Sequence, residues 1–422
     1  MTWSQRYRVR SFLKNSIWFF PFLSILFAIG LVRLISRIEP AVGWQGTFSV
    51  EGDRAIFTAM ASSMLTFIVL VFSMLLVVVQ LASAQLSPRI IATAFRDRVT
   101  KFALTVFVFT FTSSLALVRR IDSSVPPISE LIATFSNVTA AGVYLYLIDH
   151  VGQMLRPVSF ISRVATEGRA VIETIYPRRL GEREEEQAHA ADLSSGSPSR
   201  IVEHSGDGVF LAFDEVGLVE LARRTDCVIE LVLQVGDFVA KGSALFRLHG
   251  GGWLDENELQ QRVAFGPERT LEQDPAFAFR IIVDIASKAL SPAINDPTTA
   301  VLALDQLQYL LRSVGSRDLD TGRLRDATGL LRLVYRTPDW EDFVDLSVTE
   351  IRHYGKDSIQ VARRMRAMLE DLMKTVPPRR AERLQQELDL LHRSIERSFF
   401  EPADRVRADT SDSQGMGGTR QV

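Results

Sequence analysis

The chain of 422 residues has very few of the side chains that build disulfides and metal sites. It contains one cysteine, Cys227, and six scattered histidines. A single cysteine excludes an internal disulfide, and the lack of close His or Cys pairs argues against a bound metal. Lys+Arg number 48 and Asp+Glu 50, for a formal net charge of −2. A balance so close to zero gives no support to a general nucleic-acid binder, so we expect no metal, cofactor or nucleic acid.

The chain also lacks the motifs of several common catalytic sites. It has no P-loop Gly-Lys-Ser/Thr, no Gly-x-Ser-x-Gly elbow, no Gly-x-Gly-x-x-Gly after a strand and no His-Glu-x-x-His. We therefore assign no catalytic residue and place an enzyme behind the two other classes of function considered below.

Long uncharged runs, in contrast, are abundant before residue 152. Four segments lack a charged side chain for at least 17 residues: Asn15–Val32, Ala55–Pro88, Phe102–Val118 and Leu131–Ile148. A helix needs about 20 mostly apolar residues to cross the hydrocarbon core of a bilayer. Buried helices of a large soluble protein are the alternative, but four such runs so close together favour four transmembrane helices.

The basic residues orient these spans. Most of them flank the first span on its amino-terminal side, separate the second from the third, or follow the fourth: Arg6, Arg8, Arg10, Lys14, Arg89, Arg96, Arg98, Lys101, Arg156, Arg163, Arg169, Arg178 and Arg179. Basic residues accumulate on the cytoplasmic side, which predicts that both termini are cytoplasmic. No small-x-small cleavage site follows the first apolar run, so we interpret it as a span rather than as a signal peptide.

The second span carries a polar stripe whose members follow one another at intervals of 4, 7, 7 and 7 residues: Ser62, Thr66, Ser73, Gln80 and Ser87. On a helix this spacing places them on one slowly drifting face. Small polar residues can pack helices together through hydrogen bonds, or they can line an aqueous path. The sequence leaves both interpretations open.

After the membrane domain the chain changes character, and we predict an α+β cytoplasmic domain. An amphipathic helix, Arg156–Tyr176, leaves the membrane and Pro177 ends it. The predicted parts are a four-helix transmembrane domain (1–155), a juxtamembrane helix and linker (156–200), a small β module (201–252), a helical domain (253–400) and a disordered tail (401–422). Within the helical domain, Leu324–Leu331 is predicted to be a further helix and Leu333–Tyr335 a brief strand.

The β module contains Val235–Leu245, with turn signals at Gly236-Asp237 and Lys241-Gly242. This segment resembles half of a barrel-sandwich module, the kind found in lipoyl and biotinyl carriers. A carrier presents a lysine at an exposed hairpin, whereas Lys241 occupies an ordinary turn position before glycine. We therefore predict a structural module and no attached cofactor.

The most distinctive segment of the cytoplasmic half is Ala289–Ala300 (ALSPAINDPTTA). Pro292 ends the preceding helix, and Asp296 is a suitable N-cap with Pro297 at the first helical position. The segment can be a purely architectural joint between helices. It also gathers polar residues that define a candidate site for a ligand or ion, together with two upstream arginines: Arg269, Arg280, Asp284, Lys288, Ser291, Asn295 and Asp296.

Three parts of the chain together resemble a known family. They are the run from Met60 through Ser87-Pro88-Arg89, the Val235–Leu245 module, and Arg269–Asp274 (RTLEQD) followed by Ala289–Ala300. The chain is similar to the bacterial predicted-membrane-protein family called domain of unknown function 2254, over roughly residues 10–400. The resemblance implies a multi-pass protein of the bacterial inner membrane with four amino-terminal spans and a large cytoplasmic domain, and it implies no reaction.

Two classes of function follow from this organisation. The leading hypothesis is a homo-oligomeric channel or transport protein in the lipid bilayer, whose cytoplasmic domain assembles or gates it. The alternative is a membrane-anchored sensor or scaffold whose cytoplasmic domain binds a ligand or partner. The sequence does not identify the permeant ion or the small ligand.

Overall fold

The computed structural model describes residues 1–38, 50–81, 97–119, 127–154, 156–181, 197–319 and 321–416. The chain divides into two compact units. One, Arg10–Ser159, is called the membrane unit below. The other, called the large unit, combines Met1–Val9 with Phe160–Val422.

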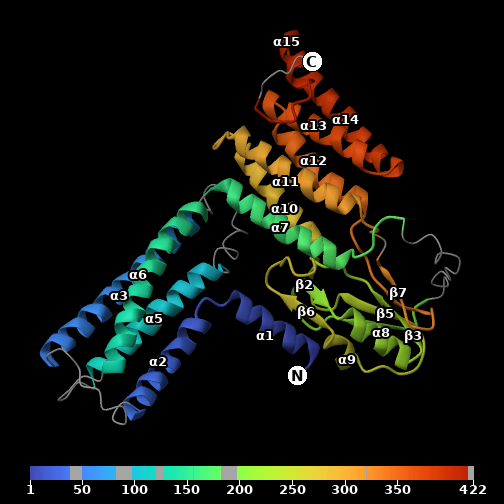
Figure 1. The fold of residues 1–422 in the computed structure, drawn as a ribbon. Coiled ribbons are helices and arrows are strands. Elements are labelled where there is room, and N and C mark those ends of the chain that lie inside the picture. The colour runs from blue at the N-terminus through green and yellow to red at the C-terminus, as the bar shows by residue number, and fades with distance from the viewer. Residues whose placement is uncertain are drawn as a thin grey trace. The chain divides into compact units, whose positions relative to one another are not determined.

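The membrane unit is a bundle of four helices, α2 (Phe19–Ile38), α3 (Val50–Leu81), α5 (Arg98–Val118) and α6 (Pro127–Met154) (Figure 1). Each contains a stretch long and apolar enough to cross a bilayer, over Phe19–Ile38, Glu51–Leu81, Arg98–Val118 and Glu130–Met154. The four predicted apolar helices are thus confirmed. Helix α6 extends past its uncharged run at both ends, whereas α2 begins inside its run, at Phe19, and continues through Arg33 and Arg37 to Ile38.

Helix α5 packs against all three of the other helices. The buried face of α3 contains Phe57, Met64, Val71, Leu75 and Val78, at spacings of three, four and seven residues. This periodicity is that of coiled-coil packing, in which one seam of a helix faces its neighbours. Large apolar side chains cover the outside of the bundle, for example Phe22, Phe135 and Leu145 at 65%, 73% and 68% exposure.

One end of the bundle is held by a carboxylate that sequence reasoning did not single out. Asp97 caps α5 by accepting hydrogen bonds from the Thr100 amide and hydroxyl, both at 2.8 Å. Its carboxylate also lies 3.1 Å from Nε2 of His150 on α6. The pair joins α5 to α6 across 53 positions of sequence, which a local pattern does not reveal.

The large unit contains two open sheets. The larger has the strand order β1-β5-β3-β8-β7 and the smaller β4-β2-β6. Their bounds are β1 (Arg200–Glu203), β2 (Gly208–Phe213), β3 (Cys227–Leu231), β4 (Phe238–Val239), β5 (Ala244–Gly250), β6 (Val263–Gly266), β7 (Arg323–Arg325) and β8 (Leu331–Val334). All pairings are antiparallel except that of β3 with β8.

A closed barrel-sandwich is not present in the described residues, because each sheet ends in edge strands and neither closes on itself. The Val235–Leu245 segment instead crosses between the sheets: its first strand, β4, joins the smaller and its second, β5, the larger. Three strands that complete the sheets, β6, β7 and β8, come from the segment predicted to be mainly helical. Of these, β8 overlaps the brief strand predicted at Leu333–Tyr335.

The predicted helix Leu324–Leu331 is wrong. This stretch forms strand β7 and a turn into β8, with Gly329 at φ +82°. The apolar residues of so short a segment are compatible with either a helix or a strand. The segment forms a strand because it pairs with β8, which in turn pairs with β3.

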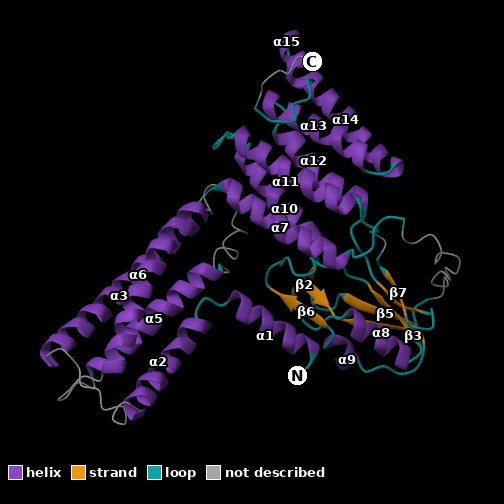
Figure 2. Ribbon diagram, viewed as in Figure 1, coloured by secondary structure: helices purple, strands orange, loops and turns teal. Residues whose placement is uncertain are grey.

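Among its described residues the large unit also contains ten helices, of which α8 packs directly against β3 and β8 of the larger sheet (Figure 2). Their bounds are α1 (Trp3–Asn15), α7 (Pro157–Ile175), α8 (Glu215–Arg224), α9 (Glu256–Gln260), α10 (Pro275–Ala289), α11 (Pro297–Gly315), α12 (Trp340–Tyr354), α13 (Ile359–Thr375), α14 (Pro378–Ser398) and α15 (Pro402–Ala408). Of α1 only the part up to Val9 belongs to the large unit, and of α7 the part from Phe160 onward. The amphipathic pattern correctly predicted α7, whose apolar side is buried. Helices α10 and α11 have ten buried residues each, and α10, at 15 residues against 19, is the more completely buried of the two.

Residues 401–416, which belong to the segment predicted to be disordered, are ordered. It forms α15 and then packs on α13, where Gln360 donates a hydrogen bond to the Gly415 carbonyl at 2.6 Å. The Arg363 guanidinium lies 3.8 Å from the buried Asp412 carboxylate. A polar composition suggested disorder, but the buried arginines of α13 supply partners that a local reading does not include.

Candidate functional site

The polar stripe of α3 lies on the outside of the membrane unit. Ser62, Thr66, Ser73 and Gln80 are all exposed, on the side of α3 opposite its buried seam. The Thr66 hydroxyl donates to the Ser62 carbonyl at 3.0 Å and the Ser73 hydroxyl to the Val69 carbonyl at 3.0 Å. The stripe therefore neither lines the inside of the bundle nor packs within it. Ser87 lies outside the described residues.

Other hydroxyl groups do lie inside the bundle. Thr110 and Ser114 on α5 are fully buried, and the oxygen of each lacks a hydrogen-bond partner among the described residues. Ser113, beside them, donates to the Thr110 carbonyl at 3.1 Å. These residues let α5 approach its neighbours closely, as small polar residues do in membrane helices.

In the large unit, the segment between α10 and α11 is built as a helix joint. The Asp296 carboxylate caps α11 through the Thr299 amide at 3.1 Å and the Thr299 hydroxyl at 2.5 Å. The Ser291 hydroxyl donates to the Lys288 carbonyl at 2.7 Å. Asn295 is exposed and has a left-handed backbone, with φ +49°. These contacts are all internal to the joint, as in its architectural interpretation.

Arg280 holds α10 to α12. It pairs with Asp284 one turn along α10 and makes two hydrogen bonds to the Glu350 carboxylate, at 2.6 and 2.7 Å. The bond to Glu350, despite partial burial, raises the pKa of Arg280. A guanidinium that makes two hydrogen bonds to one carboxylate fixes the crossing of the two helices. All three nitrogen atoms of the Arg280 guanidinium are engaged by Asp284 and Glu350.

Arg269 lies at the other end of α10. It donates to the Asp274 carboxylate at 2.7 Å and stacks over the Phe277 ring, 5.5 Å from its centre. Helix α10 has 15 residues and hence a length of about 22 Å, so Arg269 and Lys288 flank its two ends. The structure thus does not gather the seven candidate residues around one point.

The Arg269 guanidinium also packs against Gly236. A Cβ placed on Gly236, whose φ is +98°, would come within 2.3 Å of Arg269. Arg269 thereby joins two segments that the sequence singled out separately, the Val235–Leu245 turn and the RTLEQD motif.

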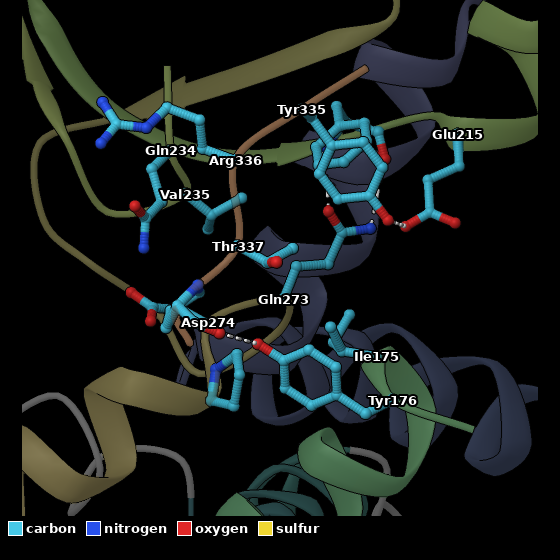
Figure 3. Close-up of a pocket in the computed structure, with 13 residues that line it drawn as sticks. Ile175, Tyr176, Glu215, Gln234, Val235, Gln273, Asp274, Tyr335, Arg336 and Thr337 are labelled. Carbon is cyan, nitrogen blue, oxygen red and sulfur yellow. Dashed lines mark hydrogen bonds between the residues drawn. The ribbon is translucent and has the colours of Figure 1, made fainter. Parts of the chain in front are cut away.

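A pocket opens beside this contact, and Figure 3 shows its lining. Its enclosed space is small, about 30 Å³, which is enough for a water molecule but far less than the roughly 300–1,000 Å³ of a typical small-molecule site. The lining comes from five places in the chain: Ile175, Tyr176, Phe213, Glu215, Gln234, Val235, Gln273, Asp274, Pro275, Tyr335, Arg336, Thr337 and Pro338.

Gln273 fixes one wall of the pocket. Its carboxamide accepts a hydrogen bond from the Phe213 amide at 3.0 Å and donates to the Phe213 carbonyl at 3.2 Å. The side chain thus continues the edge of β2 as another strand would. This contact sets the start of α10 against the sheet.

Acidic groups in the lining sit in an environment that disfavours their charge. Burial raises the pKa of Asp274 to about 6, although Arg269 opposes the shift. Burial also raises the pKa of Glu215, whose carboxylate accepts from the Tyr335 hydroxyl at 3.4 Å. Tyr176 and Tyr335 have raised pKa values for the same reason. Clefts that perturb several ionisable groups are candidate functional sites.

Sequence reasoning missed this pocket because its residues share no motif. Tyr176, Glu215, Gln234 and Tyr335 follow or begin different elements and meet only in the folded unit. Among the described residues, no three His, Cys, Asp or Glu side chains lie close enough together to hold a metal ion.

Four apolar helices joined to a large α+β unit define an integral membrane protein with a substantial domain outside its spans. The comparisons make this class more specific. The model of the family described as "Predicted membrane protein (DUF2254)" matches residues 14–371, so the chain belongs to that family and the resemblance noted from its motifs is confirmed.

Curated relatives exist in mycobacteria. An uncharacterised protein of Mycobacterium bovis and one of Mycobacterium tuberculosis are each 26% identical over 428 residues, covering 96% of this chain and 80% of the relative. No solved structure matches the chain.

Proposed function

We propose that the protein is a homo-oligomeric channel or transport protein of the bacterial inner membrane, with its large unit in the cytoplasm as an assembly or gating domain. The position of the α3 stripe is the observation that carries this proposal. Ser62, Thr66 and Ser73 face away from the bundle core. Lipid is a poor environment for a polar face, and a second copy of the chain covers it better.

The orientation is supported by the composition of the large unit. Residues before the first span and residues after the fourth belong to the same compact unit. Trp3 and Tyr7 of α1 pack against Leu211 and Ala212 of β2, and the Ser4 amide donates to the Gln261 carbonyl at 3.1 Å. Segments that fold together lie on one side of the membrane, which requires an even number of spans. The distribution of basic residues favours the cytoplasmic side.

Ion flux through liposomes that contain the purified protein tests the proposal. Leu at Ser73 and Gln80 would make a hydrophobic constriction along an oligomer axis and favour dewetting. We expect the Ser73→Leu/Gln80→Leu protein to assemble in detergent and to lose flux. The matched control is Ser63→Leu, also exposed on α3 but about 100° from Ser62 around the helix, which should retain flux.

Two results would count against the channel. One is a wild-type protein that assembles yet passes no ion under any tested voltage, pH or osmotic step. The other is equal flux from the double variant and the control. The second candidate, a membrane-anchored sensor or scaffold, would then take first place, and the perturbed carboxylates Glu215 and Asp274 of the large unit are the observation that favours it.

A further inference from the structure

Helix α1 carries four basic residues and no acidic one, and it leads directly into the first span. The basic residues are Arg6, Arg8, Arg10 and Lys14, and the first acidic residue of the chain is Glu39. The side chains of Arg6, Arg8 and Arg10 are exposed and form no ion pair within the described part of the chain. A helix with this charge attracts an anionic surface.

One side of α1 is already occupied, and the opposite side is open and apolar. Trp3 and Tyr7 pack against β2 of the smaller sheet. Successive residues of a helix are turned by about 100°, so Phe12, nine residues after Trp3, lies about 180° from it. Phe12 is 62% exposed, and its neighbour on this side, Val9, is 45% exposed. The open side therefore presents apolar surface that the rest of the chain does not cover.

Arginines border this apolar pair on both sides. Arg8 lies about 40° from Phe12 around the helix, and Arg6 lies about 60° from Val9. The order around the helix is Arg8, Phe12, Val9 and Arg6. An apolar strip between basic residues is typical of a helix that lies in the membrane interface, with its apolar residues among the acyl chains and its charges at the headgroups.

The chain keeps the end of α1 close to the bilayer. Only Ser16–Trp18 separate Asn15, the last residue of α1, from Phe19, where the first span begins. Four steps between consecutive Cα atoms cover at most about 14 Å. The headgroup region on each side of the hydrocarbon core is roughly 5–8 Å thick, so α1 ends in or near it. A phospholipid surface is thus the occupant that both chain continuity and charge select for the open side.

We propose that α1 binds anionic phospholipids in the leaflet at which the first span begins, with Arg6, Arg8 and Arg10 at their phosphates and Val9 and Phe12 among the acyl chains. The planar guanidinium of arginine matches the geometry of a phosphate and donates several hydrogen bonds to it. This binding does not depend on whether the spans conduct ions, so the two proposals fail separately.

Quenching of a fluorophore by brominated lipids tests the proposal on the full-length protein. Phe12→Cys is labelled with bimane, while native Cys227, 3% exposed, stays unlabelled. The protein is reconstituted in phosphatidylcholine vesicles that contain a minor share of either brominated phosphatidylglycerol or brominated phosphatidylcholine. The relative quenching should show a preference for phosphatidylglycerol of at least about fivefold, which is what one arginine contributes near an anionic surface. Equal quenching by the two lipids, or no quenching by either, would overturn the proposal.

Charge variants locate the preference on α1. Arg6→Gln/Arg8→Gln/Arg10→Gln should reduce the preference to about one, whereas lysine at the same three positions keeps the charge and should retain most of it. The matched control removes three exposed arginines of α14 through Arg379→Gln/Arg393→Gln/Arg397→Gln and should behave as the wild type. Thermal melting verifies that each variant is folded. An unchanged preference in the folded α1 glutamine variant, or an equal loss in the α14 control, would show that α1 does not select the lipid.

Discussion

Replacement of Gly236 by alanine is expected to damage the large unit far more than the same change at another turn glycine. Gly236 has φ +98°, a conformation that costs a side-chain-bearing residue about 1–2 kcal/mol. The new Cβ would also lie 2.3 Å from the Arg269 guanidinium, which must leave its place. Asp274, only 3% exposed, then loses its countercharge.

The magnitude follows from these two terms. A lost hydrogen bond to a buried charged group costs about 1.5–3 kcal/mol, and the lower end applies because Arg269 is one-third exposed. The total for Gly236→Ala is about 3 kcal/mol. Gly242 is the matched control: its φ is +84°, but the nearest atom to its Cβ would be a Glu203 oxygen at 4.0 Å. Gly242→Ala should therefore cost only the backbone strain, about 1–2 kcal/mol.

Chemical denaturation of the purified full-length protein, compared at the transition midpoint, measures both changes. A double-mutant cycle isolates the contact, since Gly236→Ala made in an Arg269→Ala background should cost no more than Gly242→Ala. The coupling between Gly236 and Arg269 should be about 1–2 kcal/mol. Equal costs for the two glycines, or strict additivity with Arg269→Ala, would refute the argument.

Three further outcomes are expected. A cysteine that replaces Arg119 should react with an impermeant maleimide in intact cells, whereas a cysteine that replaces Trp253 should react only after permeabilisation. The native Cys227 should not react, because it is 3% exposed. The reverse labelling pattern would show that the topology is inverted. Lys241→Arg should change the intact mass only by the difference between the two side chains and leave folding unchanged, and lipoate or biotin found on Lys241 would contradict a structural turn. Because the pKa of Asp274 rises from 3.8 to about 6 on folding, its ionisation should lower stability by up to about 3 kcal/mol as pH rises from about 4 to above 6. Asp274→Asn should remove that slope, and a variant with the wild-type pH dependence would disprove the raised pKa.

The sequence by itself determined those features that depend on near neighbours in the chain. Uncharged runs set the four apolar helices, because a bilayer demands length and hydrophobicity within one segment. The helix start at Asp296-Pro297 agrees with the structure, since helix capping is local. The sequence likewise predicted that the Ser62–Gln80 stripe forms one face of a helix, but it did not predict whether that face points into the bundle or away from it.

Only the tertiary structure decided what those elements meet. It turned the α3 stripe outward, because the apolar seam on the other side of α3 packs on α5. It made β7 a strand through pairing with β8, and it ordered residues 401–416 through partners on α13. The pocket depends on contacts such as that of Gln273 with Phe213, 60 positions apart. Packing and hydrogen bonds between distant segments leave no periodicity in the sequence, so the charged motif around Arg269 was visible while the aromatic pocket beside it was not.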